Sequence, residues 1–352
     1  MMGVHGGGRS GGAAAAAASS SAVSAKSDAA DLSYGPKVVV VGSCMIDLVF
    51  YVDRMPQLGE TMHCTSFKQG FGGKGANQAY QAALLFDSHG DVAMVGAVGD
   101  DAFGEATRDN MEDVGINVSC LALTPNHATG MAEINVDANG NNAIVIAANA
   151  NTTITPDAVA AAAHSLFASA RVVVTQLEIP LAATLEAMRH GRDAGALVVF
   201  NPAPAIADLP DEIFELADFV TPNESETSLM TGGMPVETLD EAEAAGRVLL
   251  DRGASNVILT LGARGAMWLS AGTGDAVVIP IPDPVPASAV VDTTGAGDSF
   301  VGAFAYYMAQ TDCPGIEHAI RSAHRLSAAS VQAAGTQTSY VSAVAVDPDH
   351  FH

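Results

Sequence analysis

Residues 292–298 read Asp-Thr-Thr-Gly-Ala-Gly-Asp and stand between an apolar segment, Ala289–Val291, and a longer apolar segment, Ser299–Met308. The first segment is expected to be a strand and the second a helix. Glycines at such a junction leave backbone N–H groups uncovered at the positive end of the helix dipole, where an anion binds well. The stretch therefore predicts an α/β fold with an anion site, and it puts Asp298 on the first helical turn, beside the anion.

The chain from Lys37 onward repeats this alternation of a short β-branched run and an Ala-rich stretch. Such alternation is typical of a parallel sheet whose faces are covered by helices. We therefore predict a three-layer, Rossmann-like α/β fold with a central, mostly parallel sheet and helices on both faces. The expected core strands are Val38–Val41, Val92–Val95, Val172–Val174, Leu197–Phe200, Phe219–Val220 and Val257–Thr260, and the expected helices are Gly75–Phe86, Pro156–Ala168, Leu181–Gly195 and Leu239–Gly253.

Two stretches break the alternation, at about residues 48–71 and 129–147. The second carries Asp-Ala-Asn-Gly at 137–140 between apolar runs, which predicts a hairpin turn. Both stretches are expected to form antiparallel strands that project from the main sheet. Together they would make a small β-sheet lid built from two separate insertions.

The first 36 residues are rich in Gly, Ala and Ser and have few large apolar side chains. Because they cannot bury enough surface to offset the entropy of ordering, a disordered tail is expected at 1–36, followed by one folded domain at 37–345. The alanine run at 13–18 lacks a basic start and large apolar residues. The expected location is therefore cytoplasmic, with import into an organelle left open.

The composition restricts the possible partners. The 352 residues include 15 Lys and Arg against 39 Asp and Glu, a formal net charge of -24 that repels nucleic acid and anionic membranes. No run of large apolar residues approaches the roughly 20 needed to cross a bilayer. The four cysteines form no CxxC pair, which favours reduced thiols. Neither nucleic acid nor a membrane is an expected partner, but a few N–H groups can still bind phosphate locally.

A carboxylate beside an anion site has a chemical and a structural interpretation. In phosphoryl transfer it accepts the proton of the attacking hydroxyl. In the structural alternative, Gly295 and Gly297 make a tight turn and Asp298 caps the helix. The stretch taken alone does not separate the two, so the choice depends on other motifs.

Five more motifs follow a fixed order along the chain. Residues 70–79 read Gly-Phe-Gly-Gly-Lys-Gly-Ala-Asn-Gln-Ala, 176–178 Gln-Leu-Glu, 201–204 Asn-Pro-Ala-Pro, 221–226 Thr-Pro-Asn-Glu-Ser-Glu and 260–265 Thr-Leu-Gly-Ala-Arg-Gly. Together with Gly42, Ser43 and Asp47 and with the stretch at 292–300, they resemble the motifs of the ribokinase-like sugar kinase family. The resemblance covers residues 38 to about 337. It implies that family's fold, a lid, and ATP-dependent phosphorylation of a sugar.

The resemblance also implies which residues form the site. Asp298 would be the catalytic base, with an anion hole made by Gly295, Ala296 and Gly297. The sugar would be bound by Asp47, Gly72, Gly73, Lys74, Gly75, Asn77, Glu178 and Asp298, and the nucleotide by Asn223, Thr260, Gly262, Gly265 and His324. These residue types fit, because sugar hydroxyls need paired donors and acceptors and glycines let backbone approach a ligand.

Two metal ions are implied by the same resemblance. Asn223 and Glu226 would organise Mg²⁺, which usually keeps several waters and so needs few protein ligands. A monovalent activator, K⁺, would lie next to the anion hole and fix the loop at 295–298. Its implied ligands, mostly backbone carbonyls, belong to Asp292, Thr294, Ser330, Ala333, Gly335 and Ser339.

Two positions depart from the family pattern. Met45 stands where many bacterial relatives have asparagine, two residues before Asp47, so a different sugar contact is expected there. His324 stands at an adenine-side position that is commonly Asn. Whether its ring stacks on the base or lies on the helix surface is left open.

The favoured reaction is phosphorylation of D-ribose at its 5-hydroxyl, giving ribose 5-phosphate and ADP. Kinases of the same fold for another sugar, a phosphosugar or a nucleoside, and a non-catalytic sugar sensor, are the alternatives. A phosphosugar needs clustered cations, but the lid stretches offer only the scattered Arg54, His63 and Lys68. A nicotinamide dehydrogenase is disfavoured because no Gly-x-Gly-x-x-Gly follows the first strand. The family resemblance implies a homodimer through the lid, and exposed lid-strand edges are compatible with such pairing.

Overall fold

The structure is a computed structural model that describes residues 35–342. These residues belong to the larger of two compact units, Leu32–His352. The tail predicted at 1–36 falls almost wholly outside the described residues, as do the last residues of the predicted domain. Within the described part of the chain, no helix has the length and apolarity needed to cross a membrane.

A nine-stranded sheet forms the middle layer, in the order β13-β12-β11-β10-β9-β8-β1-β4-β5. The parallel strands are β1 (Val38–Val41), β4 (Val92–Gly99), β5 (Asn117–Thr124), β8 (Val172–Thr175), β9 (Leu197–Phe200), β10 (Phe219–Val220) and β11 (Asn256–Thr260). Antiparallel pairs add β12 (Ala266–Ser270) and β13 (Ala276–Ile279) at one edge. The predicted mostly parallel sheet and its six core strands are confirmed, and the sequence did not reveal β5, β12 and β13.

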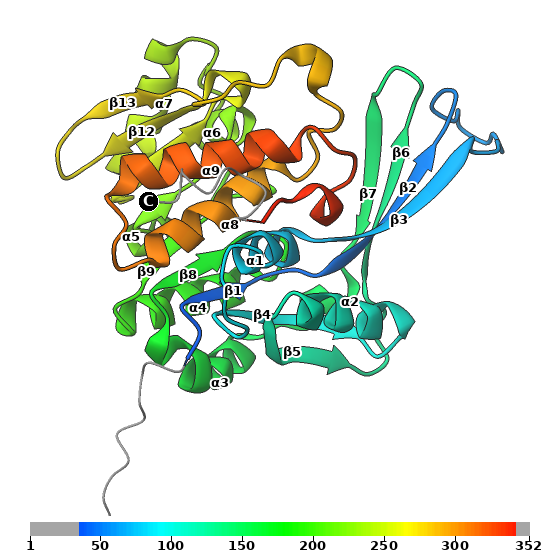
Figure 1. Cartoon of the computed structure of the whole chain (residues 1–352), viewed down its shortest axis with the longest axis horizontal. Helices are drawn as coiled ribbons and strands as arrows, with labels where there is room; N and C mark the ends of the chain where they lie inside the picture. The colour runs from blue at the N-terminus through cyan, green and yellow to red at the C-terminus, as the bar shows by residue number, and fades with distance from the viewer. Residues whose placement is uncertain (1–34, 343–352) are drawn as a thin grey trace, which may run out of the picture. The chain divides into compact units, whose positions relative to one another are not determined.

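Helices cover both faces of this sheet, and β1 shows why. Its four valines are fully buried, and successive side chains of a strand point to opposite faces. Val38 and Val40 belong to the core under α1 (Lys74–Ala83), α8 (Ala296–Ala309) and α9 (Ile316–Ser330). Val39 and Val41 belong to the core under α3 (Pro156–Leu166) and α4 (Leu181–Asp193). In Figure 1, α8 lies between α1 and α9, so the segment predicted at 292–308 packs directly beside the glycine-rich motif at 70–79.

Two more helices cover the other half of the sheet. The predicted helix at 239–253 is α7 (Leu239–Asp251), which packs on the β9–β12 half of the sheet together with α5 (Asp211–Leu216). The sequence analysis did not predict α5, α6 (Glu224–Met230), α2 (Ala102–Asp113) or α9.

The predicted lid is a separate four-stranded sheet in the order β3-β2-β6-β7, which projects from the main layer in Figure 1. The first insertion gives the antiparallel pair β2 (Met45–Tyr51) and β3 (Ser66–Gly72), and the second gives β6 (Gly130–Val136) and β7 (Asn142–Ala147). The turn at 137–140 closes as predicted, with Gly140 at φ 83.

The expectation that all lid strands are antiparallel is wrong where the two insertions meet, because β2 and β6 pair in parallel. The connectivity explains this pairing. Strand β2 follows β1 and β6 follows β5, and β1 and β5 run in the same direction in the main sheet. Two strands that continue from strands running in the same direction point the same way when they meet.

The strand predicted at Ala289–Val291 is also wrong. Ala287–Ala289 forms a 3₁₀ turn and the next two residues are irregular. Pro284 and Pro286 offer no N–H donor for a sheet ladder, and the N–H of Val291 donates to the carbonyl of Val331 after α9 at 2.8 Å. The following helix, α8, begins at Ala296, three residues earlier than predicted, and still holds Asp298 in its first turn.

Candidate active site

The N-terminus of α8 is built around two glycines with different surroundings. Gly295, the residue before the helix, has φ 76, a conformation that favours glycine. A Cβ there would lie 2.5 Å from Cγ2 of Thr336 and 2.7 Å from the hydroxyl oxygen of Tyr340. That hydroxyl donates to the carbonyl of Gly295 at 2.9 Å. The loop therefore packs closely against residues 336–340 on one side.

The other side of the loop is open. A Cβ on Gly297 would have no heavy atom within 4 Å, and Ala296 and Gly297 line a cavity. Gly295 offers no side chain to cap the helix, so the first-turn N–H groups face no side-chain acceptor. A helix N-terminus in this state suits an anion. The structure thus brings Gly295, Ala296 and Gly297 together as a possible anion hole.

Asp298 lies behind this helix start, with only 7% of its surface exposed. Its Oδ2 accepts a hydrogen bond from Nδ2 of Asn77 at 3.0 Å, and its Oδ1 accepts one from Nε2 of Gln78 at 2.9 Å. Both amides come from α1, which packs against α8. The carboxylate is therefore held at both oxygens by one neighbouring helix.

Two further carboxylates and one lysine lie near Asp298. Oε2 of Glu178 accepts hydrogen bonds from the hydroxyl of Ser43 at 2.5 Å and from the N–H of Lys74 at 2.8 Å. Burial, and then the negative charges of Glu178 and Asp298, raise the pKa of Asp47 to about 6. The charge of Asp298 raises the pKa of Lys74 against the effect of burial, and Glu178 adds to it. The predicted sugar-binding side chains therefore do converge.

The glycines at the start of α1 let this helix approach the lid root, the segment at 43–45 that leads into β2. Gly73 has φ 88, and a Cβ there would lie 2.8 Å from the nitrogen of Met45. A Cβ on Gly75 would lie 2.6 Å from the nitrogen of Ser43, and one on Gly72 would lie 2.3 Å from Oδ1 of Asp47. The predicted role of these glycines in approaching a sugar stays a prediction, because in the structure they accommodate the protein's own chain.

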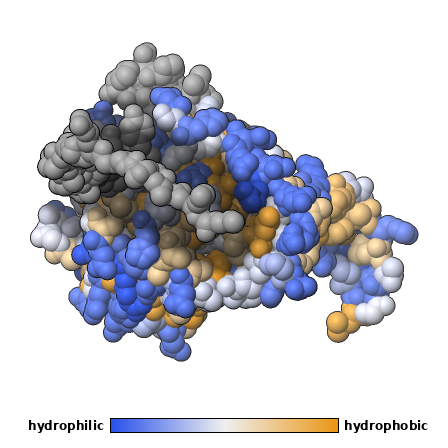
Figure 2. Space-filling view, turned by 90° about the horizontal axis from the view of Figure 1, so that it is seen from below, coloured by the Kyte–Doolittle hydropathy of each residue, from blue (hydrophilic) through white to orange (hydrophobic). Residues whose placement is uncertain are grey.

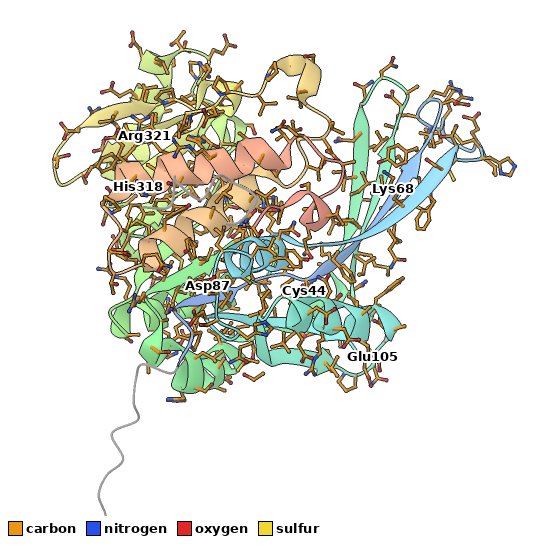
Figure 3. All side chains as sticks on the ribbon, viewed as in Figure 1. Cys44, Lys68, Asp87, Glu105, His318 and Arg321 are labelled. Atoms are coloured by element: carbon orange, nitrogen blue, oxygen red, sulfur yellow. The ribbon has the colours of Figure 1, made fainter. Side chains whose placement is uncertain are left out.

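Met45 is buried at the start of β2, two residues before Asp47 and on the same face of that strand. Figure 3 labels Cys44, which lies at the lid root, and Lys68, which lies on strand β3 of the lid.

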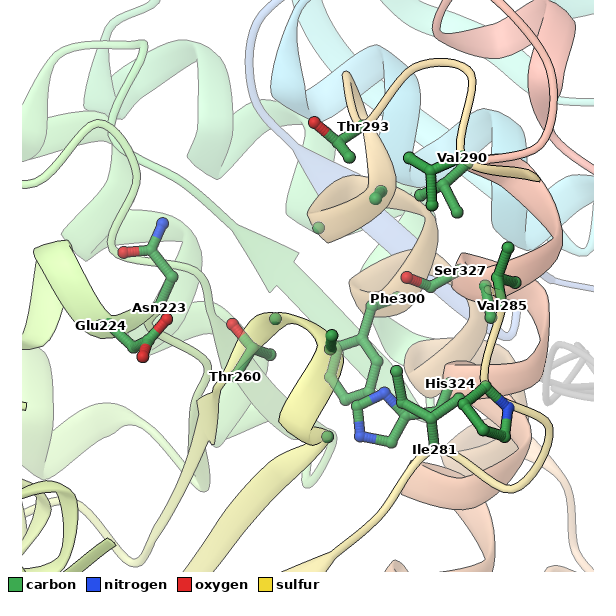
Figure 4. Close-up of a pocket in the computed structure, with 18 of the residues that line it drawn as sticks. Asn223, Glu224, Thr260, Ile281, Val285, Val290, Thr293, Phe300, His324 and Ser327 are labelled. Carbon is green, nitrogen blue, oxygen red and sulfur yellow. The ribbon is translucent and has the colours of Figure 1, made fainter. Parts of the chain in front are cut away.

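A cavity of about 550 Å³ opens beside the anion hole (Figure 4). Its polar side includes Asn223 and Thr260, and its opposite wall is apolar, with Ile281, Val285 and Val290. All five residues predicted to bind the nucleotide line it, namely Asn223, Thr260, Gly262, Gly265 and His324. A largely apolar cleft with a few polar groups next to an anion site has the composition expected for a nucleotide.

His324 is a buried residue of this cavity, so the alternative of a surface histidine is wrong. The residue is 5% exposed, and its ring centre lies 4.9 Å from that of Phe300. Figure 4 shows the two rings next to each other in the cavity wall. Burial, and to a lesser extent Arg321, lower its pKa to about 4, so the ring is neutral at pH 7. Its Nε2 is buried and has no hydrogen-bond partner among the described residues.

Asn223 and Glu226 form a capping box at the start of α6. Oδ1 of Asn223 accepts from the N–H of Glu226 at 2.8 Å, and Oε2 of Glu226 accepts from the N–H of Asn223 at 2.8 Å. Burial raises the pKa of Glu226, while the Asn223 bond and Lys74 oppose that shift. Within residues 35–342 no three His, Cys, Asp or Glu side chains could hold a metal together. The role of the pair in organising Mg²⁺, which takes most of its ligands from water and phosphate, stays a prediction.

Asp292 ties together the two segments predicted to bind K⁺. Its Oδ1 accepts from the N–H of Thr294 at 2.9 Å and its Oδ2 from the N–H of Gly335 at 3.0 Å. Burial works against its charge, but the bonds from Gly335 and Thr294 outweigh burial and lower its pKa. The hydroxyls of Ser330 and Ser339 donate to nearby backbone carbonyls, and the N–H of Ala333 donates to Ser330. The structure brings residues 292–294 next to 335, and carbonyl oxygens suit a hard monovalent cation.

Sequence reasoning missed several residues that hold the site together. Gln78 was quoted within a motif without a role, as were Gln176 and Asn201, and all three are buried in one amide network. Tyr340 was not singled out at all. The adjacency of Gln78 to Asn77 on a helix entering the site was the available indication.

Comparisons with known proteins agree with this geometry. A family model described as pfkB family carbohydrate kinase matches residues 36–343. The chain is 44% identical to mouse "Ribokinase" over 305 residues, covering 86% of this chain and 91% of the relative. It is 42% identical to "Deoxyribokinase" of Salmonella typhimurium over 307 residues, covering 87% and 95%. The solved structure of Arabidopsis thaliana ribokinase complexed with ribose and ATP has a TM-score of 0.78 at 30% identity, covering 89% of this chain and 97% of that one.

Proposed function

We propose that this chain, which belongs to the pfkB family of carbohydrate kinases, uses ATP to phosphorylate the 5-hydroxyl of D-ribose. One observation carries the proposal. The carboxylate of Asp298 lies in the first turn of α8, close enough to Asp47 and Lys74 to shift the pKa of each, and one residue from Gly297, which lines a cavity of about 550 Å³. An acceptor alcohol and a terminal phosphate can therefore meet beside one carboxylate.

In the proposed reaction the chain mainly positions the reactants and stabilises charge. Asp47 and Glu178 accept hydrogen bonds from sugar hydroxyls, while Lys74 neutralises part of their charge. Asp298 accepts the proton of the attacking hydroxyl. The N–H groups at the start of α8 stabilise the negative charge of the transferred phosphoryl group.

The metal ions implied by the family enter the proposal only as ligand sets. Glu226 and Asn223 would hold Mg²⁺ through few direct contacts, and Mg²⁺ would supply charge neutralisation at the phosphates. The loops that Asp292 joins would hold K⁺ near the anion hole. ATP as the phosphoryl donor is supported by solved relatives, including a ribokinase from Cryptococcus neoformans in complex with ADP.

A second candidate acceptor is 2-deoxyribose. The Salmonella deoxyribokinase is nearly as similar to this chain as the mouse ribokinase, at 42% against 44% identity. The two sugars differ by one hydroxyl, at carbon 2, and both present the primary hydroxyl that the base requires. The choice between them is therefore an experimental one, and the test includes both.

A homodimer through the lid and a cytoplasmic location are part of the proposal. All six residues of β7 are exposed, including Ile144, Val145 and Ile146. Figure 2 shows apolar residues among polar ones on the projecting arm. An exposed edge strand of this kind is a template for pairing with a second chain, which supports the lid as the dimer surface.

The test is a sugar panel with ATP, Mg²⁺ and either K⁺ or Na⁺, scored by ADP formation. The wild-type protein should prefer ribose and turn over faster with K⁺. Asp298→Asn should lower kcat by about 10²–10⁴-fold, the usual range for a lost general base, with thermal unfolding measured to verify the fold. Asp251→Asn, an exposed carboxylate at the end of α7, is the control and should change nothing. Near wild-type turnover by Asp298→Asn would refute the assignment, and no ADP with any sugar would favour the sensor alternative.

A further inference from the structure

We infer that Gln78 is a positioning residue that fixes the orientation of the Asp298 carboxylate. The inference rests on the proposed function, because it concerns the base of that reaction. Nε2 of Gln78 lies 2.9 Å from Oδ1 of Asp298 and 3.0 Å from Oδ1 of Asn201. Its Oε1 lies 2.6 Å from Nε2 of Gln176. Gln78 is completely buried, as is Gln176.

A backbone carbonyl sets the direction of this amide network. Nδ2 of Asn201 lies 2.8 Å from the carbonyl of Thr221, which can only accept a hydrogen bond. Asn201 must therefore point its NH₂ group at Thr221 and its oxygen at Gln78. Gln78 must then present its own NH₂ group to Asn201, and the same NH₂ group faces Asp298. The network leaves Gln78 no orientation in which its oxygen accepts a hydrogen bond from Asp298.

Both hydrogens of the Gln78 amide are thereby used, one on Asn201 and one on Asp298. Its oxygen is engaged by Gln176, so the side chain has little left to offer a sugar or a phosphate. Its effect on the reaction must pass through Asp298. With Asn77 on Oδ2 and Gln78 on Oδ1, the carboxylate plane cannot rotate without breaking a buried hydrogen bond, and an unsatisfied buried group is costly. The lone pairs of the ionised carboxylate that accept no hydrogen bond therefore keep one fixed direction.

The same helix offers a matched control in Gln81. It is also completely buried, and it also joins α1 to other elements of the site region. Its Nε2 donates to the carbonyl of Val341 at 3.0 Å, and its Oε1 accepts from the hydroxyl of Ser299 at 2.9 Å. Gln81 therefore matches Gln78 in residue type, burial and helix, but it does not touch Asp298.

The experiment compares Gln78→Met with Gln81→Met, each of which keeps the side-chain length and removes the amide. Gln78→Met should lower kcat by about 10–100-fold, as expected for a reacting group that is misplaced by a fraction of an ångström to 1 Å. The KM values for sugar and ATP should stay within about threefold, because the change acts in the transition state rather than on ground-state binding. Gln81→Met should keep kcat within about threefold at a similar loss of thermal stability.

Two results would overturn the inference. The first is a Gln78→Met protein whose kcat stays within about threefold of wild type, and the second is an equal loss of kcat in Gln81→Met. Should Gln78→Met fail to fold, Gln176→Met replaces it. Gln176 does not reach Asp298 in the structure but holds Oε1 of Gln78, so its loss should also lower kcat with KM unchanged, and an unchanged kcat would refute the inference.

A double substitution separates positioning from general structural damage. In the Asp298→Asn background, Gln78→Met should lower the residual turnover no further, because two residues that act as a unit are not additive. A further loss equal to that in the wild-type background would contradict the inference. A wild-type protein that forms no ADP with any sugar would instead remove the proposed function, and this inference with it.

Discussion

Replacing Gly295 by alanine tests whether the loop before α8 must be glycine because of its surroundings. The residue has φ 76, and an added Cβ would lie 2.5 Å from Cγ2 of Thr336 and 2.7 Å from the Tyr340 hydroxyl. Real Cβ atoms essentially never approach that closely, so Thr336 and Tyr340 must move. Such a movement would also strain the 2.9 Å bond from Tyr340 to the carbonyl of Gly295.

The expected cost has two parts. A left-handed backbone costs a residue with a Cβ about 1–2 kcal/mol. Extra atoms forced into a packed region cost about 1–3 kcal/mol more. The sum is about 2–5 kcal/mol, and for a domain of this size each kcal/mol lowers Tm by about 2 °C. Gly295→Ala should therefore lower Tm by about 4–10 °C.

Gly297→Ala, two residues along, is the matched control for the fold. Its Cβ would meet no heavy atom within 4 Å, and its backbone φ is not positive, so Tm should stay within about 1 °C of wild type. Because Gly297 lines the cavity, that same Cβ would occupy space assigned to phosphate. Gly297→Ala should therefore raise the KM for ATP without destabilising the protein.

Thermal unfolding of the three proteins, followed by ATP titration in the ADP assay, measures both effects. The reasoning fails if Gly295→Ala unfolds at the wild-type temperature, since the contacts with Thr336 and Tyr340 would then be easily relieved. It fails for the anion hole if Gly297→Ala binds and uses ATP as the wild type does.

Two more predictions concern the sugar pocket and the lid root. Because the pKa of Asp47 rises from 3.8 to about 6 on folding, the folded state alone holds a proton between these values, so stability falls as pH rises through that window. In Asp47→Asn the decrease of Tm between pH 4 and 7 should be smaller than in the wild type. The same substitution should weaken ribose binding above pH 6, where the ionised carboxylate accepts hydrogen bonds from sugar hydroxyls. Asn151→Ala removes both bonds to the backbone of Cys44, at 2.9 and 2.8 Å, and should cost about 2–4 kcal/mol in denaturant unfolding. The exposed Thr152→Ala is its control, and an equal cost in both would contradict a role for Asn151 at the lid root.

The sequence predicts those parts of the fold in which the residues present are compatible with only one local environment. Four consecutive valines at 38–41 have no polar face, so they must be a strand covered on both sides, and they are. The Asp-Ala-Asn-Gly turn at 137–140 needs a positive φ at its last residue, and Gly140 has it. These are local rules, and they also identify the glycines at 295 and 73.

The parts that the sequence did not predict depend on neighbours distant in the chain. The apolar residues at 289–291 look like a strand, but no sheet edge is available to them, and Val291 bonds to Val331 instead. The parallel pairing of β2 with β6 follows from the direction of β1 and β5, which no local pattern contains. Gln78 looks like any helical glutamine until α8 is packed beside it. Tertiary contacts decide each of these cases.

The charges of the site favour a neutral acceptor over a phosphorylated one. The charges of Glu178 and Asp298 help to raise the pKa of Asp47, so the three carboxylates lie close together, and the same two charges act on Lys74. A sugar hydroxyl donates to such carboxylates, whereas a second phosphate on the acceptor would meet their repulsion in a buried place where charges are poorly screened. The N–H groups predicted to bind the phosphates lie instead at the start of α8, beside the cavity. In the proposed function this division would let a protein of net charge -24 bind ATP, with the polyanion at the helix end and the polyol at the carboxylates.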